Sequence, residues 1–236
     1  MPNDQYFSAT PKVASERREV RLDLVDISLV LTTDRGVFSA DRVDPGTRVL
    51  LSETPAPLAT HHTIADIGCG YGPIALAAAK RAPHATVWAI DVNERARELC
   101  ALNAERNGLA NVRVAAPDEV PADLCFDAIY SNPPIRIGKV ALHELLQRWL
   151  GALTPGEGRA WLVVQKHLGA DSLARWLIEQ GWPTERIAAR QAYRILEVNA
   201  RSGLADAEAI ATETASTEVN ATETPATETP AEGTDA

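Results

Sequence analysis

The 236-residue sequence lacks the features that mark membrane, secreted and metal-binding proteins. No run approaches the ~18 consecutive apolar residues of a membrane helix, and the polar residues 1–10 contain no apolar segment of a secretory signal. The three cysteines, Cys69, Cys100 and Cys125, are widely spaced and form no CxxC pair. They therefore indicate neither a disulfide framework nor a zinc site. We expect a cytoplasmic protein with no metal and no membrane association.

A strongly basic composition, the usual property of a nucleic-acid-binding protein, is also missing. The formal net charge is −9. From Arg201 onward one basic and eight acidic residues give −7, so residues 1–200 carry only −2. The folded part is therefore nearly neutral, which counts against an RNA substrate.

The composition divides the chain into three parts. Residues 201–236 consist mainly of Ala, Thr, Glu and Pro, and they offer too few large apolar side chains to offset the entropy of ordering. We predict a disordered acidic tail. Residues 19–33 alternate apolar and polar side chains, which predicts two short strands, and residues 44–46 carry a turn signal. We assign residues 1–60 to a small N-terminal β extension packed on a catalytic domain of residues 61–200.

From residue 63 onward, strand-like apolar runs alternate with helical patterns. Strands are expected at 63–67, 85–90, 112–116, 126–131, 160–165, 186–190 and 192–198. Helices are expected at 73–82, 94–107, 141–153 and 172–180. This alternation predicts parallel βαβ units covered on both faces. The last two strands are too close for a helix between them and must form a hairpin. The predicted fold is a doubly wound, Rossmann-like α/β fold with one antiparallel strand near an edge.

The first core strand runs into the glycine-rich sequence DIGCGYG at residues 66–72. Glycines here let the chain turn tightly and let a ligand approach without interference from a β-carbon. Such a loop also occurs in NAD-binding proteins, but its GxGxG spacing differs from their GxGxxG motif. Asp66 stands directly before the loop, where a carboxylate can hold a ligand's ammonium group or order water around it. Asp66 can also cap the loop by accepting hydrogen bonds from backbone N–H groups.

Two further carboxylates follow later strands. Asp91 ends the second core strand, 25 residues after Asp66. A carboxylate at that position can accept hydrogen bonds from both ribose hydroxyls of an adenosine. Asp118 follows the third strand and could accept from an adenine amino group. The alternative for Asp118 is a solvated loop carboxylate beside Glu119.

The sequence SNPP at residues 131–134 ends the fourth core strand and so lies at the same edge of the sheet as the glycine loop. A nucleobase amine is a poor nucleophile because its lone pair is delocalised into the ring. The Asn132 side-chain oxygen and the Pro133 carbonyl can accept its two hydrogens and turn the lone pair toward a sulfonium methyl. Pro134 restricts the backbone of Pro133. Catalysis then needs orientation and hydrogen bonding rather than a strong base.

Alone, NPP is an ordinary turn sequence; together with the preceding motifs it indicates an amine-binding site.

With these motifs, residues 36–198 resemble the small RsmC/RlmG-type class I methyltransferases, which modify guanine N2 in ribosomal RNA. The resembling stretches are GVFS, VDPGT, DIGCGYG and FDAIYSNPPIRIGK. The resemblance implies a seven-stranded sheet, S-adenosyl-L-methionine as cofactor, and Asn132 as the residue that grips the amine. The expected catalytic residues are Asn132, Pro133 and Pro134. The expected cofactor site consists of Asp66, Gly68, Gly70, Tyr71, Gly72, Asp91, Asp118 and Phe38.

The expected substrate-binding residues are Ile135, Arg136 and Lys139. Many members of the family carry an aromatic residue where Ile135 stands, so stacking on the target base is expected either to be weaker or to come from Phe38 or Tyr71. Arg136 and Lys139 could hold phosphates beside the target nucleotide, or be merely solvated. The larger RsmC enzymes have a preceding duplicate domain. Only some 60 residues precede the glycine loop here, so we expect the single-domain form.

The expected partner is ribosomal RNA or the small ribosomal subunit. Three alternatives stay open: an amino methyltransferase that acts on DNA adenine N6 or a protein glutamine amide, a non-catalytic ribosome-binding factor, and an NAD-dependent dehydrogenase. The glycine spacing disfavours the last. Four tryptophans are expected to be core or helix-packing residues rather than a stacking platform: Trp149, Trp161, Trp176 and Trp182.

Overall fold

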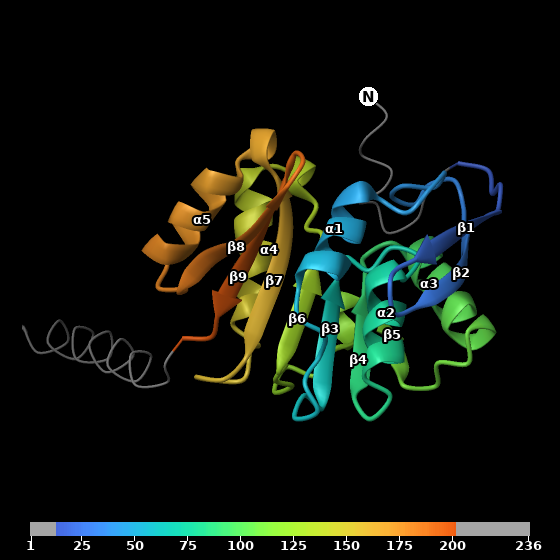
Figure 1. Cartoon of the computed structure of the whole chain (residues 1–236), viewed down its shortest axis with the longest axis horizontal. Helices are drawn as coiled ribbons and strands as arrows, with labels where there is room; N and C mark the ends of the chain where they lie inside the picture. Colours follow the sequence, from blue (N-terminus) through green and yellow to red (C-terminus); the bar gives the residue numbers. More distant parts are fainter. Residues whose placement is uncertain (1–12, 202–236) are drawn as a thin grey trace, which may run out of the picture. The chain divides into compact units, whose positions relative to one another are not determined.

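The computed structural model describes residues 13–201, so the predicted disordered tail lies outside the described residues from residue 202 onward. Its centre is a seven-stranded sheet in the order β5-β4-β3-β6-β7-β9-β8 (Figure 1). The strands of this sheet are β3 (Thr63–Ile67), β4 (Thr86–Ile90), β5 (Val112–Ala115), β6 (Ala128–Ser131), β7 (Arg159–Gln165), β8 (Thr184–Arg190) and β9 (Tyr193–Asn199). The α-helices are α1 (Pro45–Glu53), α2 (Pro73–Arg81), α3 (Glu94–Arg106), α4 (Lys139–Leu150) and α5 (Ala170–Glu179).

The strand directions confirm the predicted doubly wound fold. Strands β3 to β7 pair in parallel, whereas β9 is antiparallel to both of its neighbours, β7 and β8. Strands β8 and β9 form the expected hairpin. The strand order reverses between β3 and β6, and in open α/β sheets the ligand crevice lies at the carboxyl ends of the strands at this switch point.

Two apolar clusters fill the two faces of the sheet. One combines the sheet with α1, α2, α3 and the separate hairpin of β1 (Arg18–Asp23) and β2 (Ser28–Thr33); the other combines it with α4 and α5. Side chains alternate between the clusters along the central strands: Val163 of β7 faces the first cluster and Val164 the second. Because both faces are covered, the strands read as nearly continuous apolar runs.

The turn expected at residues 44–46 is instead the start of helix α1. Asp44 is the N-cap residue and accepts a hydrogen bond from the Thr47 N–H at 3.1 Å, and Pro45 occupies the first turn. Proline is favoured at that position because its missing N–H would have no helical partner. Leu50 and Leu51 then bury one face of the helix. The segment expected to be a β extension therefore contains a helix, and this helix reaches the candidate site.

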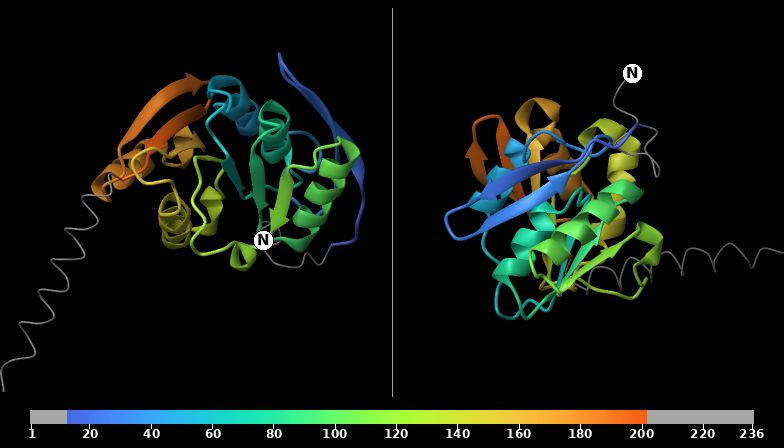
Figure 2. Two further views of the ribbon diagram at one scale, coloured as in Figure 1. Left: turned by 90° about the horizontal axis from the view of Figure 1, so that it is seen from below. Right: turned by 90° about the vertical axis from the view of Figure 1, so that its right-hand side faces the viewer.

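The β1–β2 hairpin lies beside α3 (Figure 2), and a buried asparagine of that helix holds it there. The Asn103 side chain of α3 is fully buried. Its Oδ1 accepts from the Thr32 N–H at 2.7 Å, and its Nδ2 donates to the carbonyls of Thr32 at 2.8 Å and Tyr71 at 2.9 Å. One amide therefore ties the hairpin, the helix and the glycine loop together.

We predict that Asn103→Ala lowers the free energy of unfolding by roughly 3 kcal/mol, because three buried backbone groups lose their partner. The matched control is Glu105→Ala, at an exposed position of the same helix. That control is expected to change stability by less than about 0.5 kcal/mol. Urea denaturation of both variants measures the difference. Equal stabilities would show that Asn103 does not anchor the hairpin.

Candidate functional site

A cavity of about 430 Å³ lies at the carboxyl ends of the central strands. Nine of the residues expected to form the site line it: Phe38, Gly68, Gly70, Asp91, Asn132, Pro133, Pro134, Ile135 and Arg136. The fold therefore brings the glycine loop, the carboxylate that follows β4 and the NPP motif to one cavity.

The glycine loop leaves its backbone open to the cavity. Gly68 and Gly70 have φ angles of 75° and 55°, in the left-handed region that favours glycine. An added β-carbon at either position would meet no atom within 4 Å, so the space next to this backbone is free for a ligand. Gly72 differs, because a β-carbon there would lie 2.7 Å from Cys100 Sγ. Gly72 therefore allows the close packing of α2 on α3 and lies outside the lining.

Asp91 connects two loops at the cavity. Its Oδ2 accepts from the Gly70 N–H and its Oδ1 from the Asn93 N–H, each at 2.8 Å. Burial raises the pKa of the Asp91 carboxyl in spite of these two bonds. Each oxygen keeps a lone pair beyond its backbone contact, so the carboxylate can still accept from hydroxyl groups in the cavity.

Asp66 is 1% exposed and lies behind the glycine loop, outside the cavity lining. Its Oδ2 accepts from the Ala75 N–H at 2.9 Å, which corresponds to the capping alternative considered for it. Its Oδ1 is buried and has no hydrogen-bond partner within residues 13–201. Burial, with a smaller contribution from Asp91, raises the pKa of Asp66 to about 8. The unsatisfied oxygen is suited to a cation or a water molecule supplied with a ligand.

The amide of Asn132 has a fixed orientation. Its Nδ2 donates to Asp44 Oδ1 at 2.8 Å and to Thr47 Oγ1 at 3.1 Å. An ionised carboxylate only accepts hydrogen bonds, so the NH₂ group must face Asp44. The Asn132 Oδ1 is left as an acceptor in a cavity that both residues line. Asp44 and Thr47, at the start of α1, are thus hydrogen-bond partners of the expected catalytic Asn132 that the sequence did not reveal.

The Pro133 carbonyl is also held in place. It accepts a hydrogen bond from the Ile135 N–H at 2.8 Å, across Pro134 with φ −75° and ψ 72°. These angles and this bond define an inverse γ-turn. The turn occupies one lone pair of the Pro133 oxygen and leaves the other for a donor. The strand before it is anchored by Ser131, whose hydroxyl donates to the Ile67 carbonyl at 2.7 Å.

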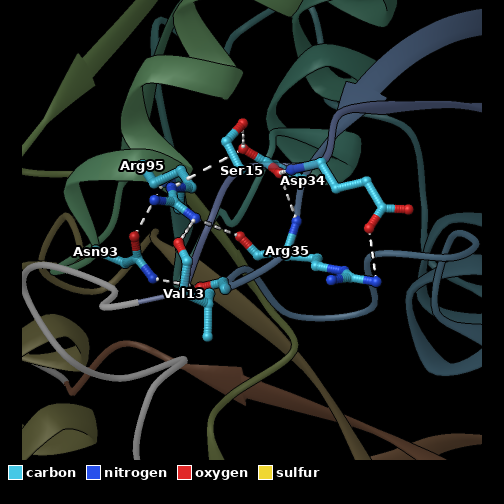
Figure 3. Close-up of polar contacts among 9 residues, drawn as sticks. Val13, Ser15, Asp34, Arg35, Asn93 and Arg95 are labelled. Atoms are coloured by element: carbon cyan, nitrogen blue, oxygen red, sulfur yellow. Dashed lines mark hydrogen bonds and ion pairs between the residues drawn. The ribbon is translucent and has the colours of Figure 1, made fainter.

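The loop that carries Phe38 is held against the start of α3 by a polar network (Figure 3). The Arg95 guanidinium donates to the carbonyls of Val13 at 2.9 Å and Arg35 at 2.8 Å. The Asn93 Nδ2 donates to the Gly36 carbonyl at 2.9 Å. These bonds keep Phe38, which is 48% exposed, at the cavity.

Other expected residues lie outside the lining. Tyr71 is buried and its hydroxyl donates to the Arg42 carbonyl at 3.4 Å, so its ring is not presented to the cavity. Asp118 is exposed in the one-turn helix η1 (Pro117–Glu119), and Pro117 lines the cavity in its place. Lys139 is exposed at the start of α4. Of the two aromatic residues considered for stacking, the structure leaves Phe38 available.

The lining residues that were not expected at the site include Trp149, Gln165 and Tyr193. Trp149 is buried, as predicted for a core residue, but it also borders the cavity. The sequence could have indicated that Gln165 lies at the site, because it is the polar last residue of an apolar strand that ends at the carboxyl edge of the sheet. The sequence contains no such indication for Tyr193, since its position depends on the pairing of β9 with β7.

Residues 13–201 contain no group of three or more His, Cys, Asp or Glu side chains placed to hold a metal ion. No helix within this part of the chain is long and apolar enough to cross a membrane.

Residues 28–197 match the family model described as the methyltransferase small domain. Uncharacterized protein YbxB of Bacillus subtilis is 36% identical over 198 residues, which cover 83% of this chain and 98% of that protein. Ribosomal RNA small subunit methyltransferase C of Shewanella loihica is 30% identical over 175 residues. That match covers 69% of this chain and 50% of the relative, so the chain spans about half the length of that enzyme.

A similar fold occurs in a solved structure, the Thermus thermophilus 16S rRNA N2 G1207 methyltransferase (RsmC) in complex with AdoMet and guanosine. The TM-score is 0.65 at 23% sequence identity, over 81% of this chain and 52% of that one. At this identity the likeness supports the fold, the seven-stranded Rossmann-like arrangement described above.

We predict that Asp66→Asn removes a pH dependence of stability. The folded-state pKa of Asp66 is raised from 3.8 to about 8, so its stabilising contribution is present below pH 3.8 and is lost as the pH rises through about 8. The amide variant keeps an acceptor for the Ala75 N–H and carries no charge. Scanning calorimetry should give similar melting temperatures near pH 4 and a higher one for the variant near pH 9.

The control for this measurement is Asp118→Asn, at the exposed carboxylate of η1. Its melting temperature should follow that of the unaltered protein at every pH. A variant at position 66 that also follows the unaltered protein would mean that Asp66 is ionised at neutral pH in the folded state.

Proposed function

Because this chain belongs to the methyltransferase small domain family, we propose that it is an S-adenosylmethionine-dependent methyltransferase that modifies the exocyclic N2 amine of guanine in small-subunit ribosomal RNA. The observation that carries this proposal is the orientation of Asn132, whose NH₂ group is bound by Asp44 and whose oxygen is left for the cavity. A protein that only bound RNA would gain nothing from such an acceptor beside a nucleotide-type loop.

The residues of the cavity fit S-adenosylmethionine, which supplies an electrophilic methyl group when bound. Asp91 offers lone pairs for the ribose hydroxyls, and the open backbone at Gly68 and Gly70 allows the close approach of a ligand. The unsatisfied Oδ1 of Asp66 can interact with an ammonium group, directly or through water. The pKa of Asp66 would then fall on binding, because a nearby positive charge favours the ionised carboxyl.

Asn132 and Pro133 act on the substrate amine by orienting it. Their two oxygens accept its two N–H groups, which directs the nitrogen lone pair toward the side of the cavity lined by Gly68 and Asp91. Asp44 strengthens this contact, because a carboxylate bound to the Asn132 amide polarises its oxygen. The rate gain comes from this alignment. No strong base is required, because the methylated nitrogen loses its extra proton to water after the transfer.

The choice of ribosomal RNA is supported by the names of the similar proteins. The target base must be unpaired or flipped, because its amine is shielded in a duplex. Phe38 is exposed at the cavity and can stack on the base, and Arg136 can contact a neighbouring phosphate. The proposal includes a cytoplasmic location, with the small ribosomal subunit as partner.

The substrate class is tested by offering the full-length protein and labelled S-adenosylmethionine to three substrates: unmodified small-subunit RNA, unmethylated DNA and ribosomal protein. We expect label only in the RNA, and nuclease digestion with mass spectrometry should identify it as N2-methylguanosine. Label on adenine N6 or on a protein glutamine would contradict the proposed substrate. Cofactor binding without any transfer would contradict the proposal that this is an enzyme.

We predict that Asn132→Ala reduces kcat by roughly 100-fold or more with cofactor affinity unchanged, since it removes an acceptor that acts on the amine. Asp44→Asn should reduce kcat by roughly 10-fold, because an amide at position 44 can also donate and no longer fixes the Asn132 orientation. Thr47→Val removes only the longer hydrogen bond to Asn132, so it should reduce kcat less than Asp44→Asn does.

Single-turnover kinetics measure the rate of transfer of the three variants, and calorimetry with S-adenosylhomocysteine measures their affinity for the cofactor. An Asn132→Ala protein with normal turnover would remove the amine-orienting role. A loss of cofactor affinity equal to the loss of rate would indicate that the residue serves the cofactor instead.

A further inference from the structure

Two polar side chains on the β7–β9 side of the cavity have no part in the transfer described above. Gln165 is the last residue of β7 and Tyr193 the first of β9, and both line the cavity. They are direct partners in the antiparallel ladder, so their side chains stand next to each other on one face. The Gln165 Nε2 donates to the Tyr193 hydroxyl oxygen at 3.2 Å.

Strand alternation turns both side chains to the face covered by α1. Val163 and Ile195, two residues away on the same strands, are buried in the cluster that includes α1. Gln165 and Tyr193 continue this row to the end of the ladder, where the apolar packing gives way to the cavity. In Figure 1, β7 lies between β9 and β6, the strand that leads to the NPP motif.

The tyrosine ring is held in place by the helix that also orients Asn132. A β-carbon added at Gly46 of α1 would lie 2.7 Å from Tyr193 Cε1, so the ring packs directly on the helix backbone. Asp44, two residues earlier, caps this helix and binds the Asn132 amide. One turn of α1 therefore positions both the amine acceptor and Tyr193.

The distance along the sheet suits one planar base. Ser131 pairs with Leu162 in the parallel ladder, so Asn132 is level with Val163, two residues before Gln165. Two residues of a strand span roughly 7 Å. This separation is comparable to the width of a purine that extends from Asn132 to the Gln165–Tyr193 pair.

The free groups of the pair form an acceptor beside a donor. With its Nε2 bound to Tyr193, Gln165 keeps Oε1 as an acceptor, and Tyr193 keeps its O–H as a donor. Guanine presents its exocyclic amine, its ring N1–H and its O6 in a row along one edge. Once Asn132 and Pro133 bind the amine, the two groups that follow require an acceptor and then a donor.

Resting on the proposed function, we propose that Gln165 and Tyr193 determine the base specificity of this site. Gln165 Oε1 accepts from the ring N1–H of guanine, and the Tyr193 hydroxyl donates to O6. Adenine has a ring acceptor beside its amine and no carbonyl, and a glutamine side chain has no such edge. Either substrate would leave Gln165 and Tyr193 without hydrogen-bond partners in a desolvated site. Unpaired buried polar groups of this kind give strong discrimination between substrates.

The test compares two single-stranded oligouridylates, one with a single guanosine and one with a single 2-aminopurine riboside. Both bases carry the 2-amine, but 2-aminopurine lacks the N1–H and O6. We expect the unaltered protein to prefer guanine by roughly 100-fold or more in kcat/KM. Gln165→Leu and Tyr193→Phe should each lower kcat/KM for guanine by roughly 10-fold or more and leave that for 2-aminopurine within about threefold.

Tyr193→Phe keeps the ring that packs on Gly46, so its fold should be preserved, and melting curves verify this. The matched control is Gln147→Leu, at an exposed glutamine of α4, which should keep the full preference for guanine. If the unaltered protein methylates the guanine and both site variants keep its preference, the specificity role is overturned while the proposed function stands. If the three-substrate comparison described under the proposed function labels only adenine or protein, both proposals fail.

Discussion

The hydrogen bond between Asn132 Nδ2 and Asp44 Oδ1 is the contact on which the site depends. An asparagine amide can rotate and exchange its donor and acceptor ends, and a partner that can only accept, or only donate, prevents this. Asp44 is that partner, and it is held in turn by its role as N-cap of α1. A helix-capping interaction therefore fixes which way a proposed catalytic amide points, and the same turn of α1 supports Tyr193 through Gly46.

The sheet topology supplies the rest of the arrangement, at a cost in stability. The reversal of strand order between β3 and β6 brings the glycine loop and the NPP motif to one cavity. Asp66 and Asp91 are both buried, and the charge of Asp91 adds to the effect of burial in raising the pKa of Asp66. Asp66 also keeps one oxygen without a hydrogen-bond partner in the described chain. A core selected for stability alone would not contain two buried carboxyl groups with an unsatisfied oxygen. Such unfavourable buried groups are typical of functional sites.

The sequence predicted the fold and the main motifs because their signals are local. Apolar strands between helical patterns, the DIGCGYG loop and NPP are each read within a few residues. The start of α1 was misread as a turn, since Asp-Pro-Gly serves equally as a turn signal and as a helix cap. The pairing of Gln165 with Tyr193 could not be predicted, because it depends on the register of β7 with β9. Tyr71 was expected near the base, but its ring is buried in the core, a matter of packing that a motif does not encode.

The most direct test of this account is a high-resolution crystal structure of the protein with S-adenosylhomocysteine and guanosine. The account predicts that the sulfur and the guanine amine meet beside Asn132, with the Asn132 Nδ2 still bound to Asp44 and its oxygen on the amine. A ligand bound elsewhere, or an Asn132 amide with its oxygen turned toward Thr47 and Asp44, would contradict it.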